Sequence, residues 1–257
     1  IFRSPSGMSN GIKFDAYGNM VVCEGADYGG RRVTRTNMKT GQSFVIAALF
    51  NGRQLNAPND VTIDEQGRMY FSDPRYMGRE SIEQPVMGVY RIDTDLSLHR
   101  IITDVAKPNG VCVSPDQKTL YVVCHNNGST AAIPPIENEE EPKPMKGKMQ
   151  LMAYDLNADG TASFRKTLVD YYPQDGPDGL CCDAKGNVYV AERDTTKPGI
   201  GIYDPEGKQL DFIPTELPTN VGFGRGKDAN LLYITAGSSL FRIRLTIPGY
   251  QLPGKTH

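Results

Sequence analysis

Several features are scarce in this sequence, and each absence excludes a class of protein. The 28 basic and 30 acidic side chains nearly cancel, which leaves a net charge of −2 at pH 7. No basic stripe interrupts this balance, so a nucleic-acid partner is not expected. The longest apolar run, Phe44 to Phe50, is far shorter than the roughly 20 residues that cross a bilayer. The sequence therefore predicts a soluble protein with no membrane segment.

Cysteine and histidine are also few, with five and three residues. An odd number of cysteines cannot form a fully paired disulfide framework, and no C-x-x-C pair occurs. A zinc site made of thiolates or imidazoles is therefore not expected. Unpaired cysteines favour a reducing compartment, so the cytoplasm is the expected location and the periplasm is the alternative. The sequence opens at Ile1 rather than at a methionine, which leaves a targeting segment open.

What is present is a phrase that occurs five times: a polar residue in a turn, an apolar strand, a tight turn and a second apolar strand. The copies cover residues 9–24, 58–73, 108–124, 177–192 and 219–236, and their lead polar residues are Asn10, Asn59, Asn109, Asp178 and Asn220. These leads are spaced 49, 50, 69 and 42 residues apart. A strand-only repeat of about this length is typical of a β-propeller, in which equivalent positions converge on one axis.

Each copy extends into about four strands separated by Asp-Gly-type turns, and no helical periodicity is seen. The sequence predicts an all-β, six-bladed β-propeller with four-stranded antiparallel blades around a central axis, in a single domain of residues 1–257. Ile1–Arg3 resembles the outer strand of an earlier sheet, so the first blade is expected to be partly missing at the N-terminus. A closed ring of five blades is the alternative.

Two long segments interrupt the repeat, at residues 74–88 and 126–148. The second is acidic and rich in proline. If the lead polar turns lie on one face, both segments leave the scaffold from that face. Loops at one end of a rigid scaffold commonly form a binding site, so residues 126–148 are predicted to be an insertion on the active-site face. The alternative is a solvated surface insertion.

Taken singly, the tripeptides P-N-D, P-N-G and P-D-G are ordinary turns. As a set around one axis, their amide and carboxylate oxygens would form a hard-oxygen cage suited to Ca²⁺ or Mg²⁺. A cage with few carboxylates leaves the ion much of its charge, which favours a Lewis-acid role.

The ends of the second strands form another set of polar residues. Asp73, Arg75, Tyr76 and His125 are predicted to form a polar wall that holds a sugar-like substrate, and His125 could assist proton transfer near neutral pH. The alternative is that these side chains are surface residues balanced by nearby charges.

Four stretches carry a resemblance to a known family: LNAPNDVTIDEQGRMYFSDP, KPNGVCVSPDQKTLYVV, GPDGLCCDAKGNVYVAE and PTNVGFG with LLYITAGSSLFRI. They resemble the gluconolactonase branch of the SMP-30/gluconolactonase/luciferin-regenerating family. The resemblance implies a six-bladed propeller with one divalent metal ion, usually calcium, at its centre. It also implies that Asn109 and Asp178 are metal ligands and that Asp178 is the general base. Asn59 would bind the metal or contact the substrate beside it.

The sequence departs from the family pattern at two places. The E-G-P segment that supplies a glutamate ligand does not occur, and Glu24 is a tempting substitute, although it ends a second strand. Some members have an arginine two residues before the asparagine that Asn59 matches, and this position is Ala57 here. Substrate contacts in that corner are therefore expected to differ.

These observations predict a hydrolase that opens a sugar lactone or related cyclic ester. Asp178 is the predicted base, and the predicted cofactor is one divalent cation, most simply Ca²⁺, with Mg²⁺, Mn²⁺ and Zn²⁺ as alternatives. The expected partner is a small-molecule lactone or ester, and the oligomeric state is open. The competing hypotheses are a calcium-binding propeller that binds another protein and an organophosphate or other ester hydrolase on the same site.

Overall fold

The structure, a computed structural model, describes residues 1–129 and 146–255, so most of the predicted insertion 126–148 lies outside the described residues. The chain divides into two compact units. Unit 1 contains Ile1–Pro108, Asn126–Gly147 and Gly254–His257, and unit 2 contains Asn109–His125 and Lys148–Pro253. That residues 1–257 form one domain stays a prediction. In the part of the chain described, no helix is long and apolar enough to pass through a membrane.

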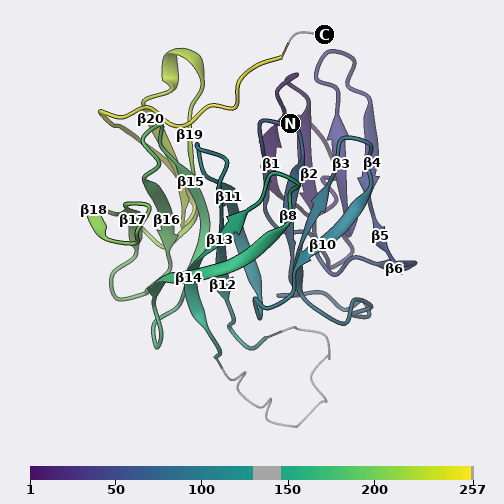
Figure 1. Ribbon diagram of the computed structural model, residues 1–257, viewed down its shortest axis with the longest axis horizontal. Coiled ribbons are helices and arrows are strands. Elements are labelled where there is room, and N and C mark those ends of the chain that lie inside the picture. The colour runs from purple at the N-terminus through teal and green to yellow at the C-terminus, as the bar shows by residue number, and fades with distance from the viewer. Residues whose placement is uncertain (130–145, 256–257) are drawn as a thin grey trace. The chain divides into compact units, whose positions relative to one another are not determined.

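Unit 1 is built of two four-stranded antiparallel sheets and a short hairpin (Figure 1). The first sheet contains β1 (Ser9–Phe14), β2 (Met20–Glu24), β3 (Arg32–Thr36) and β4 (Ser43–Ala47). The second contains β7 (Val61–Ile63), β8 (Met69–Asp73), β9 (Gly88–Ile92) and β10 (Leu98–Ile102), and the hairpin contains β5 (Leu49–Phe50) and β6 (Arg53–Gln54). In both sheets the strands pair in chain order.

Unit 2 contains three further antiparallel sheets, two with four strands and one with three. The four-stranded sheets are β11 (Pro108–Val113), β12 (Thr119–His125), β13 (Met149–Leu156) and β14 (Ala162–Asp170), and β15 (Pro177–Cys182), β16 (Val188–Glu192), β17 (Gly199–Tyr203) and β18 (Gln209–Pro214). The third sheet contains β19 (Pro218–Phe223), β20 (Leu231–Ala236) and β21 (Ser239–Arg244), and the 3₁₀ turn η1 (Gly226–Asp228) lies between β19 and β20.

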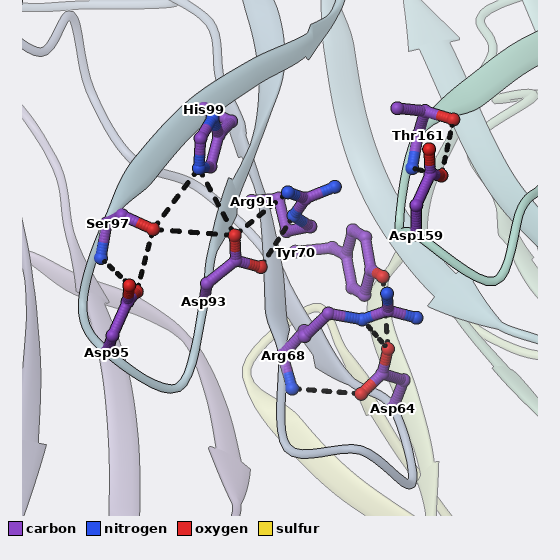
Figure 2. Close-up of polar contacts among 10 residues, drawn as sticks. All are labelled: Asp64, Arg68, Tyr70, Arg91, Asp93, Asp95, Ser97, His99, Asp159 and Thr161. Carbon is purple, nitrogen blue, oxygen red and sulfur yellow. Dashed lines mark hydrogen bonds and ion pairs between the residues drawn. The ribbon is translucent and has the colours of Figure 1, made fainter.

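The tight turns predicted between the first two strands are present in the first four blades, whereas a longer connection that contains η1 joins β19 to β20 in the fifth. In the turn between β7 and β8, the Gly67 amide donates to the Asp64 carbonyl over 3.0 Å. The Asp64 side chain also accepts from the Arg68 amide and guanidinium and from the Tyr70 hydroxyl, as Figure 2 shows. Gly67 has a φ of +94°, a conformation that glycine adopts without strain. The D-x-x-G pattern therefore encodes the hairpin.

All-β architecture with repeated antiparallel blades is confirmed, but the blade number is corrected. The described residues form five blades rather than six, because each of the five copies of the phrase forms one sheet. Ile1–Arg3 is not a strand, and the last blade has three strands rather than four. The arrangement of the blades around an axis stays a prediction.

All five cysteines lie in strands as buried free thiols. Cys112 of β11 and Cys182 of β15 face each other across one apolar cluster of unit 2, with their sulfur atoms 3.7 Å apart. Burial raises the pKa of the Cys23 thiol well above its usual value, and the nearby carboxylates raise it further. This placement is that of cysteines which pack as small hydrophobic residues.

Candidate functional site

Within each unit, two turns that carry lead polar residues lie side by side because a glycine follows one of the leads, Asn10 in unit 1 and Asn109 in unit 2. In unit 1, the Gly11 amide donates to the Asn59 carbonyl over 2.7 Å, and a Cβ on Gly11 would lie 2.6 Å from the Asp60 Cα. In unit 2, a Cβ on Gly110 would collide with the carbonyl oxygen of Asp178. Asn109 and Asp178 therefore begin two neighbouring strands, β11 and β15, whose backbones touch at this point.

The prediction of Asn220 as the lead residue of the fifth copy is wrong by one position. The Asn220 side chain accepts a hydrogen bond from the Val221 amide over 2.8 Å, just as the Asp60 side chain accepts from the Val61 amide over 2.9 Å. Asn220 therefore corresponds to Asp60, and exposed Thr219 takes the position of Asn59. Both P-N-D and P-T-N have two polar residues after the proline, so the sequence pattern alone does not show which of the two is the lead residue.

In unit 1, Asn59 is held by its backbone on both sides. Its amide donates to the Ser72 carbonyl over 2.9 Å, and its carbonyl accepts from Gly11. The Asn59 side chain is half-buried. The turn that carries a predicted metal or substrate contact is thus fixed by β1 and β8 of the same unit.

Asp73, predicted to contact substrate, is fully buried and binds the turn that precedes Asn59. Its two carboxylate oxygens accept hydrogen bonds from the backbone amides of Asn56 (2.9 Å) and Ala57 (2.8 Å). Burial raises the pKa of Asp73 to about 7, against the lowering effect of these amides and of Arg31 and Arg75. The structure gives this carboxylate a positioning role, and contact with a substrate stays a prediction.

Arg75, also predicted to contact substrate, is completely buried beside a second arginine, Arg31. The Arg75 guanidinium donates to the carbonyls of Asn56 (3.1 Å) and Glu80 (3.0 Å) and forms a 3.3 Å ion pair with the Glu80 carboxylate. Burial and the charge of Arg31 lower the pKa of Arg75. Arg31 donates to the carbonyls of Asn56 and Ser81. The two arginines anchor residues 74–88 to the same turn that Asp73 holds.

Tyr76, the next predicted substrate contact, is partly exposed and lies against a lysine that the sequence did not single out. The Nζ atom of Lys107 lies 4.4 Å from the centre of the Tyr76 ring, and burial lowers the pKa of Lys107 to about 8. Lys107 occupies the place before the P-N turn that Ala57 takes in the preceding copy. A lysine in one copy at the position of an alanine in another is the sequence signal that could have pointed to Lys107.

In unit 2, Asn109 is buried and Asp178 is partly exposed, with a side-chain exposure of 26%. The guanidinium of Arg193, the residue after β16, lies 3.5 Å from the Asp178 carboxylate and donates to the Pro218 carbonyl over 2.9 Å. Arg193 thereby ties the turn at the start of β15 to the turn at the start of β19. Asp178 is the accessible carboxylate of the predicted metal set.

His125, the last residue of β12, supports the segment that leads into Asp178. Its Nδ1 atom lies 3.0 Å from the carbonyl oxygens of both Gly176 and Pro177. Carbonyl oxygens only accept hydrogen bonds, so Nδ1 carries a proton and donates it, which assigns Nε2 as the acceptor of the neutral ring. Burial lowers the pKa of His125, although the two carbonyls raise it. His125 is therefore predominantly neutral at pH 7.

Glu24, the considered substitute for the absent glutamate ligand, is buried within ion pairs of unit 1. Its carboxylate lies 2.8 Å from Arg3 and 2.7 Å from Arg32, and it accepts from the Thr34 hydroxyl over 3.2 Å. Two guanidinium groups already neutralise this carboxylate, so its surroundings favour a structural role.

No group of three or more histidine, cysteine, aspartate or glutamate side chains that could hold a metal occurs within residues 1–129 and 146–255. The predicted ligands are Asn59, Asn109 and Asp178. They contain two amides and one carboxylate, so they are not a group of this kind. Asn109 and Asp178 lie on neighbouring strands of unit 2, whereas Asn59 belongs to unit 1. Their joint coordination of a metal stays a prediction.

Comparison with known proteins gives consistent results. The chain matches the family model of the SMP-30/gluconolactonase/LRE-like region over residues 1–142 and 145–238. It is 29% identical to a gluconolactonase of Zymomonas mobilis over 95% of this chain and 64% of that protein, and 27% identical to a lactonohydrolase of Aspergillus oryzae over 82% of this chain and 49% of that protein. A solved gluconolactonase structure from Xanthomonas campestris superimposes with a TM-score of 0.74 at 26% identity, covering 97% of this chain and 74% of that one.

The chain thus spans about half to two thirds of the length of these curated relatives. The family model covers nearly the whole chain, including all five copies of the repeated phrase. The chain belongs to the SMP-30/gluconolactonase/LRE-like family.

Proposed function

We propose that this protein is a divalent-metal-dependent hydrolase that opens a sugar lactone or a related cyclic ester, with Asp178 as the general base. The observation that carries the proposal is the close approach of β11 and β15, which puts the amide of Asn109 and the accessible carboxylate of Asp178 at the start of neighbouring strands. The Zymomonas and Xanthomonas relatives, which are gluconolactonases by name, support the choice of a lactone.

The residues present fit a hard divalent cation, because amide and carboxylate oxygens are the donors that Ca²⁺ and Mg²⁺ prefer. Asn109 and Asp178 of unit 2 would hold the ion, with Asn59 as the third predicted ligand. When bound, the cation supplies Lewis-acid polarisation of a carbonyl group.

The chemistry assigned to the chain's own residues is proton transfer. Asp178 orients a water molecule and accepts its proton as the water oxygen bonds to the lactone carbonyl carbon. The ring C–O bond then breaks, and the proton returns from Asp178 to the departing ring oxygen, which yields the open hydroxy acid. Arg193 and His125 keep Asp178 in place through the carbonyls of Pro218, Gly176 and Pro177.

The Asp178→Asn variant tests this assignment. The amide keeps the size and one ligand oxygen of the carboxylate but cannot accept a proton, so kcat should fall by on the order of 10²-fold or more. The melting temperature should stay close to that of the wild type. Rates are measured by pH-stat on a panel of lactones, after subtraction of the uncatalysed rate.

Asp211→Asn, which neutralises an exposed carboxylate on β18 of the same unit, is the matched control and should leave kcat unchanged. Near-wild-type lactone opening by Asp178→Asn would remove Asp178 from the role of base.

A further inference from the structure

Lys107 is a buried lysine of unit 1 that the proposed reaction does not use. Only 2% of the surface of Lys107 is exposed to solvent. Its Nζ donates to the Asn127 side-chain oxygen over 2.7 Å and to the Ser129 carbonyl, and it lies over the Tyr76 ring. These three contacts join the segment 126–129, at the start of the second long insertion, to Tyr76, in the first.

The described residues provide no carboxylate within ion-pair distance of the Lys107 ammonium. A buried cation without a counter-ion is unfavourable for folding, because its hydration is lost and no opposite charge replaces it. An apolar residue of similar length would be expected at a position that served stability alone. The choice of lysine therefore points to a role beyond stability.

The segment that Lys107 binds is also ordered by its own local bonds. The Gly128 amide donates to the Asn126 side chain over 3.1 Å, and the Gly147 amide donates to the Asn126 carbonyl over 2.8 Å. A Cβ on Gly147 would collide with the Asn126 side chain in its present position, so glycine allows this close approach. The two ends of the insertion are thus closed at Asn126 and Gly147, and Lys107 fixes the closed end against Tyr76.

We propose that Lys107 is a positioning residue that sets substrate selection by holding Tyr76 and residues 127–129 as one surface for the hydroxyl-bearing side of a lactone. The inference rests on the proposed function for the substrate class. Charge and hydrogen bonding hold this surface together, and none of its groups is assigned a part in the chemical step. Loss of the Lys107 contacts should then weaken the binding of a substituted lactone more than it slows the chemical step.

The test compares Lys107→Met and Lys107→Arg with the wild type on two lactones: glucono-δ-lactone, which carries several hydroxyls, and unsubstituted δ-valerolactone. Lys107→Met should raise KM for gluconolactone by about 10-fold with kcat changed by no more than about two-fold. Its kinetics on valerolactone should stay at wild-type values. Lys107→Arg, which keeps the charge and the donors, should recover most of the loss.

Two further measurements separate this role from a merely structural one. The melting temperature of Lys107→Met should equal or exceed that of the wild type, because it removes a buried charge that no carboxylate of residues 1–129 and 146–255 pairs with. Hydrogen exchange of the Ser129 amide, which donates to Asn127, should speed up by at least about 10-fold in this variant. Equal losses on both lactones, or unchanged exchange at Ser129, would overturn the inference.

Failure of the proposed function gives a different result. A wild-type protein that opens neither lactone would refute substrate selection together with the lactonase assignment. Hydrogen exchange would still decide whether Lys107 orders residues 127–129, since that measurement needs no substrate.

Discussion

At the scale of single residues, the buried carboxylate of Asp73 gives a pH-dependent prediction. Its pKa is raised to about 7 in the folded protein, above the usual value of an unfolded chain. Asp73 therefore contributes stability that is fully present below about pH 4 and is lost as the pH rises through about 7. Asp73→Asn, which stays neutral, should lack this loss.

The measurement is urea unfolding of the wild type and Asp73→Asn at pH 4.5, 6 and 7.5. Between the first and last values, the wild type should lose on the order of 3 kcal/mol relative to the variant. If the wild type instead gains stability relative to Asp73→Asn as the pH rises, the folded protein favours the ionised carboxylate, and the assignment of Asp73 as a group with a raised pKa is wrong.

How far the sequence predicts the site depends on the kind of information each residue carries. The pairing of Asn109 with Asp178 follows from the repeated phrase, because equivalent positions of neighbouring blades are brought together by the fold. The burial of Asp73 and Arg75 does not, because it depends on amides and carbonyls of Asn56 and Ala57 that no side-chain pattern reveals. The contacts of Lys107 could not be predicted either, because its partners lie in the two long insertions, outside the repeated pattern.

At the scale of elements, the glycines that follow Asn10, Asn109 and Asp178 determine how neighbouring inner strands approach. A Cβ on Gly110 would collide with the Asp178 carbonyl and would lie 2.5 Å from Leu180 Cδ2. Gly110→Ala should destabilise the protein by roughly 1–3 kcal/mol, the usual cost of overpacking a core. It should also lower lactone-opening activity, because it pushes β15 and Asp178 away from Asn109.

Gly222→Ala is the matched control, because a Cβ at this position on β19 of the same unit meets nothing within 4 Å. Chemical denaturation and kinetics of both variants provide the comparison. If the two variants are equally stable, the glycines of the P-N-G and P-D-G tripeptides are needed for the turn alone and not for the close approach of β11 and β15.

The hairpins were predictable for a local reason: D-x-x-G places its acceptors and its positive φ within five residues, as at Asp64 to Arg68. The alignment of Asn220 was not, because a one-residue shift leaves the pattern of apolar and polar residues in the turn nearly unchanged. The hydrogen bond from the Val221 amide and the register of β19 on β20 distinguish the two positions. The last blade has three strands rather than four. Its strand number depends on which segments pair, and the sequence of each strand does not specify its partner.

At the scale of the whole molecule, five antiparallel blades and the family match together support a shared fold with the gluconolactonases. The proposed function requires one bound divalent metal ion. Removal of that ion should abolish lactone opening and also lower the melting temperature of the protein.

The most direct measurement is lactone opening as a function of bound metal. The protein is stripped with a chelator, its metal content is measured by mass spectrometry, and Ca²⁺, Mg²⁺, Mn²⁺ or Zn²⁺ is added back in steps. The proposed function predicts no catalysis above the spontaneous rate in the stripped protein, with activity restored in proportion to bound cation up to about one per chain. Full lactonase activity in protein shown to be free of metal would contradict it.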